Sequence, residues 1–282
     1  MAENFLTGIL TIKDAIKGGF VIAEAILSVV PICNKIIIND AGSTDGTLEL
    51  FYRLKEMYPD KIEILNIPDY ESQHFELVDD VINTHILPSL DSEWVISLEG
   101  DTVWHEDNIF DLLTIMKTTE CNSILQPGWD VQWCTKTAYK DFLSVRIVKN
   151  LPGLKITEGG GGFCINGQRY SNPKYAMSGV PPEHEIEYPR FHFPYLFPGN
   201  LLERARRHAE FLEVGNEYRR QNYLDLKKQL EGITFVKQNI TPSKNLPSLV
   251  KGLAGEPYYY VREDLFNKNW LKELTGLDYG PC

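Results

Sequence analysis

The chain of 282 residues carries a formal net charge of −11, and 43% of its residues are hydrophobic. This acidic balance argues against a nucleic-acid-binding surface, which needs a basic footprint. The length allows one large α/β domain with an appendage, or two small domains.

Cysteine usage and the apolar runs indicate the compartment. The five cysteines are scattered and form no Cys-x-x-Cys pair, which argues against a disulfide framework or a zinc site. The N-terminus lacks the positive start of a signal peptide, and the longest apolar run, 21–33, is too short to span a bilayer. We therefore expect a cytoplasmic protein without a transmembrane segment, and peripheral contact with a membrane stays open.

The first elements form a strand, a polar loop and a helix. Residues 5–12 read as a strand and are followed by the polar loop 13–19. Residues 21–30 form an apolar helical pattern that Pro31 ends, with small residues suited to close packing on a sheet. This order of elements predicts an α/β fold.

Residues 35–47 predict a second strand, a tight loop and the start of a helix. A β-branched run over 36–38 is typical of a strand buried on both faces, and the following residues are dense in turn formers. In a parallel sheet such a loop lies at the carboxyl end of the strand, where open α/β folds bind ligands. We expect Asp40 to lie at the lip of that crevice and to accept hydrogen bonds from a ribose or base.

This stretch closely resembles the Asp-Asp-Gly-Ser-Thr-Asp-Gly-Thr motif of the family 2 glycosyltransferases, with Asn39 in place of the first Asp. The resemblance implies a GT-A fold, which is a Rossmann-like, mostly parallel sheet flanked by helices. It also implies that nucleotide-binding residues lie at the ends of the first two strands. These residues are Thr11, Lys13, Asp40, Gly42 and Ser43. An acidic turn after a strand, without a ligand, is the alternative.

A second acidic segment follows the strand predicted over 93–98. Glu99 and Asp101 flank Gly100, and because like charges repel, a divalent cation is expected to compensate them. The pattern resembles the Asp-x-Asp motif of GT-A transferases. That resemblance implies that Glu99 and Gly100 contact the nucleotide and that Asp101 ligates Mn²⁺ or Mg²⁺. The alternative is a helix N-cap, since a helix is predicted to begin near Asp107.

Further strands and helices are predicted downstream. Residues 61–67, 122–126 and 142–149 read as strands, and 73–87 and 108–117 as helices. The stretch 146–153 resembles the Arg-Leu-Phe-Arg-Asn-x-Pro-Gly segment of many family 2 members. Those relatives then carry a His-Glu pair whose Glu is a proposed base, but this chain has a run of glycines at that point. The run could be a mobile loop over the acceptor site, a tight hairpin or a surface loop.

The general base is therefore open between two carboxylates. Glu158 directly precedes the glycines, and Glu185 follows His184 and restores the missing dipeptide. The alternation over 186–192 suggests a strand. His192 takes the position of the histidine that often completes the metal site in the resembling family, and a structural role for it is the alternative.

The resemblance covers residues 1–198, the expected GT-A domain, and 199–282 is expected to be a helical and irregular extension packed on it. It implies an inverting, metal-assisted transfer of a sugar from a nucleotide-diphosphate donor to an acceptor hydroxyl. The acceptor could be a glycan, a lipid-linked molecule or a protein. A nucleotidyltransferase is one rival, although the loop 13–19 lacks its Arg and tight glycine spacing. A non-catalytic nucleotide-sugar-binding module is the other.

Overall fold

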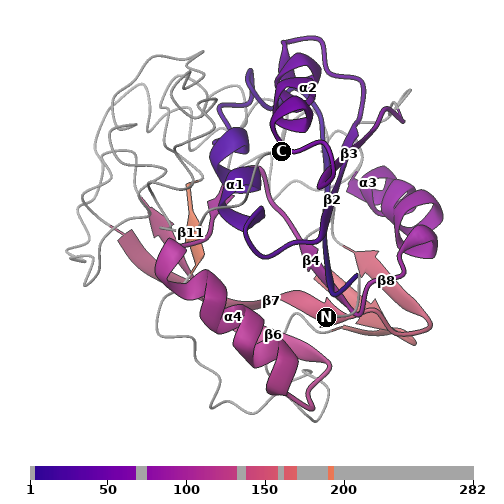
Figure 1. Cartoon of the computed structure of the whole chain (residues 1–282), viewed down its shortest axis with the longest axis vertical. Coiled ribbons are helices and arrows are strands. Elements are labelled where there is room, and N and C mark those ends of the chain that lie inside the picture. The colour runs from indigo at the N-terminus through magenta and orange to yellow at the C-terminus, as the bar shows by residue number, and fades with distance from the viewer. Residues whose placement is uncertain (1–3, 68–74, 132–137, 158–161, 170–189, 194–282) are drawn as a thin grey trace, which may run out of the picture.

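A computed structural model describes residues 4–67, 75–131, 138–157, 162–169 and 190–193 (Figure 1). Its strands are β1 (Leu6–Ile12), β2 (Lys35–Asp40), β3 (Ile62–Leu65), β4 (Trp94–Ser97), β5 (Thr102–Val103), β6 (Ser123–Val131), β7 (Ala138–Lys149), β8 (Leu154–Thr157), β9 (Gly162–Ile165), β10 (Gln168–Arg169) and β11 (Arg190–His192). Its helices are α1 (Ile22–Val29), α2 (Thr47–Met57), α3 (Phe75–Val81) and α4 (Glu106–Thr118), with a π-helical turn (Ile82–Ile86) and a 3₁₀ turn (Leu87–Ser89) after α3.

The main sheet has eight strands in the order β3-β2-β1-β4-β7-β6-β11-β5. The half formed by β3, β2, β1 and β4 is parallel. In the other half, β7 runs antiparallel to both β4 and β6, and β11 is parallel to β6 but antiparallel to β5. The expected α/β fold is present, but the sheet is mixed rather than mostly parallel. A smaller antiparallel sheet has the order β10-β9-β8.

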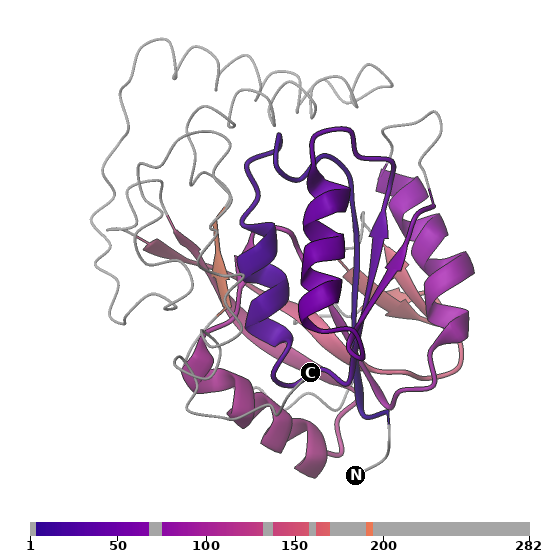
Figure 2. The same cartoon turned by 45° about the horizontal axis from the view of Figure 1, so that its top comes forward.

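Two apolar cores cover the two faces of the main sheet. Helices α1, α2 and α4 pack on one face, where their side chains join Leu10, Ile38 and Ile96 of the central strands. The π-helical turn and strands β8 and β9 pack on the other face, against Ile9 and Ile37. Figure 2 shows α1 and α2 side by side in front of the sheet, with α3 apart from them. Both faces of β1 and β2 are therefore buried, as the β-branched run predicts.

Most predicted elements are confirmed within one to a few residues at each end. The sequence pattern did not predict the short strands β5 and β10 or the strands β8 and β9. These last two pair antiparallel on either side of 158–161, with Thr157 opposite Gly162, which agrees with the hairpin alternative for the glycine run. Of the strand expected over 186–192, the described part is β11. The extension 199–282, and with it the boundary after 198, lies outside the described residues.

Within the described ranges, no helix is long and apolar enough to cross a membrane. Three of the cysteines, Cys33, Cys121 and Cys164, lie in the same ranges and are buried free thiols. For these three residues, the expected absence of a disulfide framework agrees with the structure.

Candidate functional site

Asp40 ends β2 and organises the turn that follows it. Its Oδ2 accepts hydrogen bonds from the backbone N–H groups of Gly42, at 3.0 Å, and Ser43, at 2.8 Å. Gly42 has φ +85°, a conformation that glycine adopts without a Cβ penalty. The expected position at the lip of a crevice is wrong, because the Asp40 side chain is 0% exposed. Its Oδ1 is buried and has no hydrogen-bond partner among the described residues.

The turn 41–47 is joined to the loop 13–19 by four hydrogen bonds. The Asp14 N–H donates to Ser43 Oγ at 2.7 Å, and the Thr44 N–H donates back to Asp14 Oδ1 at 2.8 Å. The Lys17 N–H donates to Asp45 Oδ2 at 2.6 Å, and a fourth bond runs from the Ile16 N–H to Thr47 Oγ1 at 3.2 Å. Much of the polar motif therefore builds a rigid edge at the carboxyl ends of β1 and β2.

Thr11 and Asp40 lie on opposite faces of the sheet at this edge. Thr11 pairs with Asn39 in the β1–β2 register, and successive side chains of a strand alternate between faces. Thr11 Oγ1 is a second buried polar atom that finds no partner in the described part of the chain. Lys13, two residues further on, is exposed. The edge thus offers two unsatisfied buried oxygens and an exposed lysine.

The hydrogen bonds of Asn39 explain why this chain has an amide where the resembling motif has an aspartate. Its Oδ1 accepts from the Ile67 N–H at 2.9 Å, and its Nδ2 donates to the Ile67 carbonyl at 3.3 Å. A carboxylate could only accept, so an amide is the side chain that satisfies both backbone groups. Asn39 therefore anchors the segment after β3.

Gly100 brings the β4–β5 turn against the end of β1. A Cβ at this position would lie 2.5 Å from Ile12 Cδ1 and 3.0 Å from a ring carbon of Phe20. Because Ile12 also pairs with Asp40, the end of β2 and the turn after β4 both lie beside Ile12. Close packing against Ile12 and Phe20 favours glycine here, and the expected nucleotide contact of Gly100 stays a prediction.

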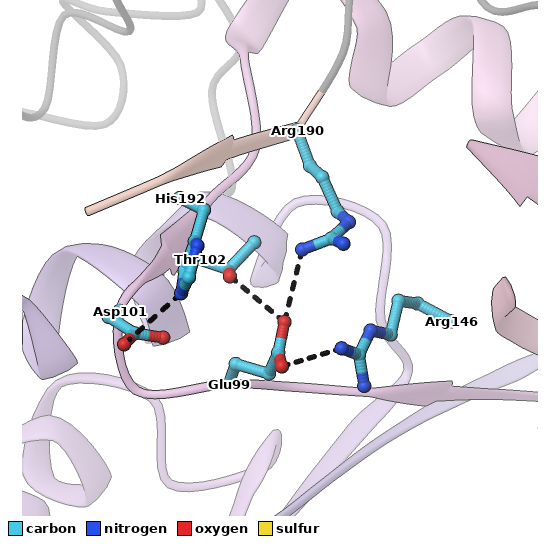
Figure 3. Close-up of polar contacts among 6 residues, drawn as sticks. All are labelled: Glu99, Asp101, Thr102, Arg146, Arg190 and His192. Carbon is cyan, nitrogen blue, oxygen red and sulfur yellow. Dashed lines mark hydrogen bonds and ion pairs between the residues drawn. The ribbon is translucent and has the colours of Figure 1, made fainter. Parts of the chain in front are cut away.

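Glu99 is the centre of a charged cluster formed with Thr102, Arg146 and Arg190, which we name the Glu99 cluster (Figure 3). Arg146 Nη2 lies 2.6 Å from Oε1 and Arg190 Nη1 lies 3.1 Å from Oε2. The Thr102 hydroxyl also donates to Oε2, at 3.1 Å. The sequence analysis expected a metal ion to compensate this carboxylate. In the structure two nearly buried guanidinium groups compensate it, with side-chain exposures of 7% and 2%.

Asp101 faces His192 across the β5–β11 pair. His192 Nε2 lies 3.4 Å from Asp101 Oδ2, and the Phe193 N–H donates to the Asp101 carbonyl at 2.7 Å. The two side chains are 7% and 24% exposed. The structure therefore brings together the two residues that the resemblance assigned to the metal. The N-cap alternative for this segment is wrong, because His105 caps α4 by accepting from the Asp107 N–H at 3.2 Å.

A carboxylate and an imidazole form a donor set that suits Mn²⁺, while Mg²⁺ favours the oxygen. No group of three or more acidic, histidine or cysteine side chains in the described ranges could hold a metal ion. A metal ion at Asp101 and His192 stays a prediction. Both candidate bases, Glu158 and Glu185, lie outside the described residues.

The contacts of Arg146 and Arg190 with Glu99 were not predicted. In the sequence, Arg146 is only the start of a matched stretch, and Arg190 is only part of an alternating pattern. One signal was available: Arg190 precedes His192 by two residues, so both side chains lie on one face of a strand. The partner of Arg190 could not be inferred, because Glu99 is 91 residues away in the chain.

Comparisons with known proteins give only distant structural likenesses. No protein-family model and no curated protein matches the chain. A solved structure of S. aureus TarS 1–349 is 14% identical, with 81% of this chain and 77% of that chain covered and a TM-score of 0.39. The complex of TarS 1–349 with UDP is 12% identical, with 83% of this chain and 73% of that chain covered and a TM-score of 0.39. The complex with UDP-GlcNAc is 14% identical, with 81% of this chain and 77% of that chain covered and a TM-score of 0.43. At such scores the likeness assigns no residue role to this chain.

Proposed function

We propose that the chain is an inverting glycosyltransferase of the family 2 type with a GT-A fold. It would move a sugar from a nucleotide-diphosphate donor to a hydroxyl of a glycan, lipid-linked or protein acceptor. The observation that carries the proposal is the Asp101–His192 pair, which lies in and beside the turn after β4. Asp40, which precedes the motif turn, pairs with Ile12, and the turn after β4 packs on the Ile12 side chain.

The nucleoside would bind at the carboxyl ends of β1 and β2. Asp40 Oδ1 and Thr11 Oγ1 are buried oxygens without partners in the described ranges, and such atoms are costly unless a donor reaches them. Base N–H and ribose O–H groups are donors of this kind. Lys13 is exposed and would contact the ribose or a phosphate from the loop after β1.

The diphosphate would bind beside Asp101 and His192 together with Mn²⁺ or Mg²⁺. When bound, the ion supplies Lewis-acid chemistry and neutralises charge on the departing diphosphate. Asp101 would contribute a carboxylate oxygen and His192 its Nε2. Glu99 would stay out of the coordination shell, because both of its carboxylate oxygens already accept hydrogen bonds.

A carboxylate must deprotonate the acceptor hydroxyl, and we propose Glu158 ahead of Glu185. Glu158 follows β8 directly, and that strand is anchored near its end by Asn83. The Asn83 amide accepts from the Ile156 N–H at 2.8 Å and donates to the Ile156 carbonyl at 3.0 Å. A fixed strand end holds the residue that follows it in place, as a catalytic residue requires.

Calorimetry tests the donor site. UDP, GDP, ADP and CDP, each with its monophosphate, are titrated into the chain with and without Mn²⁺. We expect one diphosphate to gain affinity with Mn²⁺ and its monophosphate to gain much less. Asp101→Asn should remove that gain. The control Asp60→Asn makes the same change at an exposed position and should leave it intact. If Mn²⁺ strengthens the binding of none of the four diphosphates, the proposal is wrong.

Donor hydrolysis and transfer test the catalytic part. Glu158→Gln should retain diphosphate binding and lose transfer by about a hundredfold or more, the usual contribution of a general base. If Glu185→Gln loses transfer and Glu158→Gln does not, Glu185 is the base. A wild-type chain that binds the diphosphate but neither hydrolyses nor transfers any donor sugar would instead be a binding module.

A further inference from the structure

We propose that Glu99 is a positioning residue that holds His192 against Asp101, acting through Arg190. The first acid of the acid-Gly-acid segment would then serve neither as a metal ligand nor as a nucleotide contact. The proposal deepens the proposed function, because it concerns the residues placed at the metal. It is an inference about protein geometry, so it can be tested in the absence of any nucleotide.

Two contacts join the turn after β4 to β11, and on each segment the two contacting residues lie two positions apart in the sequence. Glu99 and Asp101 belong to the turn after β4, and Arg190 and His192 belong to β11. Glu99 contacts Arg190 at 3.1 Å, and Asp101 contacts His192 at 3.4 Å. Figure 3 shows both β11 side chains pointing from the strand toward the turn. A fixed contact between Glu99 and Arg190 therefore fixes the position of His192 relative to Asp101.

Backbone pairing covers few of the described residues in this part of the sheet. Strand β11 has three residues and forms two residue pairs with β5 and three with β6. The buried Phe191 defines the face of the strand that packs in the core, and a slip of one residue would turn His192 to that face. The ion pair between Glu99 and Arg190 joins segments 91 residues apart and supplies a side-chain lock on that register.

Arg146 adds a second positive charge beside Glu99. It binds the other carboxylate oxygen from β7, so two nearly buried guanidinium groups share one anion. Each of them lies within 3.1 Å of that carboxylate. Replacing the carboxylate with a neutral amide would leave two like charges close together with less compensation, and like charges repel. Because Arg146 is on the long strand β7, we expect the short strand β11 to move.

Histidine ring signals in heteronuclear NMR spectra of the full chain test the geometry without nucleotide. The His192 signals are identified by their loss in His192→Gln. In Glu99→Gln we expect them to shift, while the ring signals of His85, an exposed residue of the π-helical turn, stay in place. The matched control Glu63→Gln makes the same change at the exposed ion pair with Lys35 and should shift neither.

Two conservative variants keep the test decisive if Glu99→Gln does not fold. Glu99→Asp and Arg190→Lys retain the charges and shorten or reshape the contact, so each should shift the His192 signals. Unchanged His192 signals in every folded variant of this contact would overturn the proposal. An equal shift of the His85 signals would also overturn it, because the effect would then be general unfolding.

Mn²⁺ dependence separates positioning from simple loss of stability. In the proposed transferase, Glu99→Gln should need at least about tenfold more Mn²⁺ for half-maximal transfer and should recover most of its rate at saturating Mn²⁺. A merely destabilised protein would show a lower rate with an unchanged Mn²⁺ requirement, which would count against the proposal. If the wild type binds no diphosphate with Mn²⁺, the proposed function fails, and the NMR result still decides the role of Glu99.

Discussion

Asp40→Ala should destabilise the protein substantially, and not only weaken a ligand contact. The carboxylate is fully buried and accepts two backbone hydrogen bonds, at 3.0 Å from Gly42 and 2.8 Å from Ser43. Alanine would leave both N–H groups without this acceptor. The turn would lose the bonds that hold it, and with them part of the connection to the loop 13–19.

The magnitude follows from three contributions. A hydrogen bond to a charged group contributes about 1.5–3 kcal/mol net, so two contribute about 3–6 kcal/mol. Against this, alanine removes Oδ1, a buried oxygen with no partner in the described ranges, whose burial costs about 1–3 kcal/mol. The central values of these ranges give an expected net loss of about 2–3 kcal/mol. Asp40→Asn keeps one acceptor oxygen and should lose about half as much, because neutral hydrogen bonds are roughly half as strong.

Urea unfolding and hydrogen exchange measure this loss. The midpoint should fall for Asp40→Ala, and the amides of Gly42 and Ser43 should exchange faster, since both lose their acceptor. The exposed control Asp60→Ala should change the free energy of unfolding by about 0.5 kcal/mol or less. An Asp40→Ala variant as stable as this control, with unchanged protection at both amides, would refute the argument from burial.

Three further predictions concern packing, hydrogen bonding and pH. Gly100→Ala should lower the free energy of unfolding by about 1–3 kcal/mol, because its Cβ would lie 2.5 Å from Ile12 Cδ1; an unchanged urea midpoint would contradict this. Asn39→Asp should cost about 1–3 kcal/mol, because a carboxylate cannot donate to the Ile67 carbonyl, and restored stability at a pH that protonates it would support this reason. Burial raises the pKa of the Cys33 thiol from 9.0 to about 12, so the unfolded chain releases this proton first. Stability relative to Cys33→Ala should be constant below pH 9 and fall by about 1.4 kcal/mol per pH unit from there toward pH 12, and a flat difference would contradict the shift.

The sequence predicted the βα units well because their signals are local. The β-branched run before Asp40 and the helical spacing after Thr47 depend on neighbours within one or two turns of chain. One of the strands that were not predicted depends on a distant partner. Strand β5 has two residues and pairs with β11 almost 90 residues later, so no local period marks it. Strand order in the mixed half of the sheet is set by such pairings in the same way.

The candidate site was likewise predicted only in part. The proximity of Asp101 and His192 was predicted, but from the resemblance and not from spacing. The need of the paired acids for positive charge was predicted, and two arginines supply it to Glu99. The metal ion expected at Asp101 stays a prediction. A sequence shows that an anion needs a partner, but not which of many cations in the chain the fold brings to it.

Burial and hydrogen-bonding capacity decide which motif atoms are left for a ligand. Asp45 and Thr47 hold each other and the loop 13–19, so their side chains stabilise the edge of the sheet. Ser43 Oγ accepts from Asp14, which leaves its hydroxyl hydrogen for another acceptor. In Asp40, two donors already share Oδ2 while Oδ1 has no described partner. A nucleoside that enters this edge would therefore meet one carboxylate oxygen already oriented by the turn, and its N–H or O–H group would remove the cost of burying that oxygen. In the proposed site the same carboxylate, which is 0% exposed, would build the turn and select the ligand.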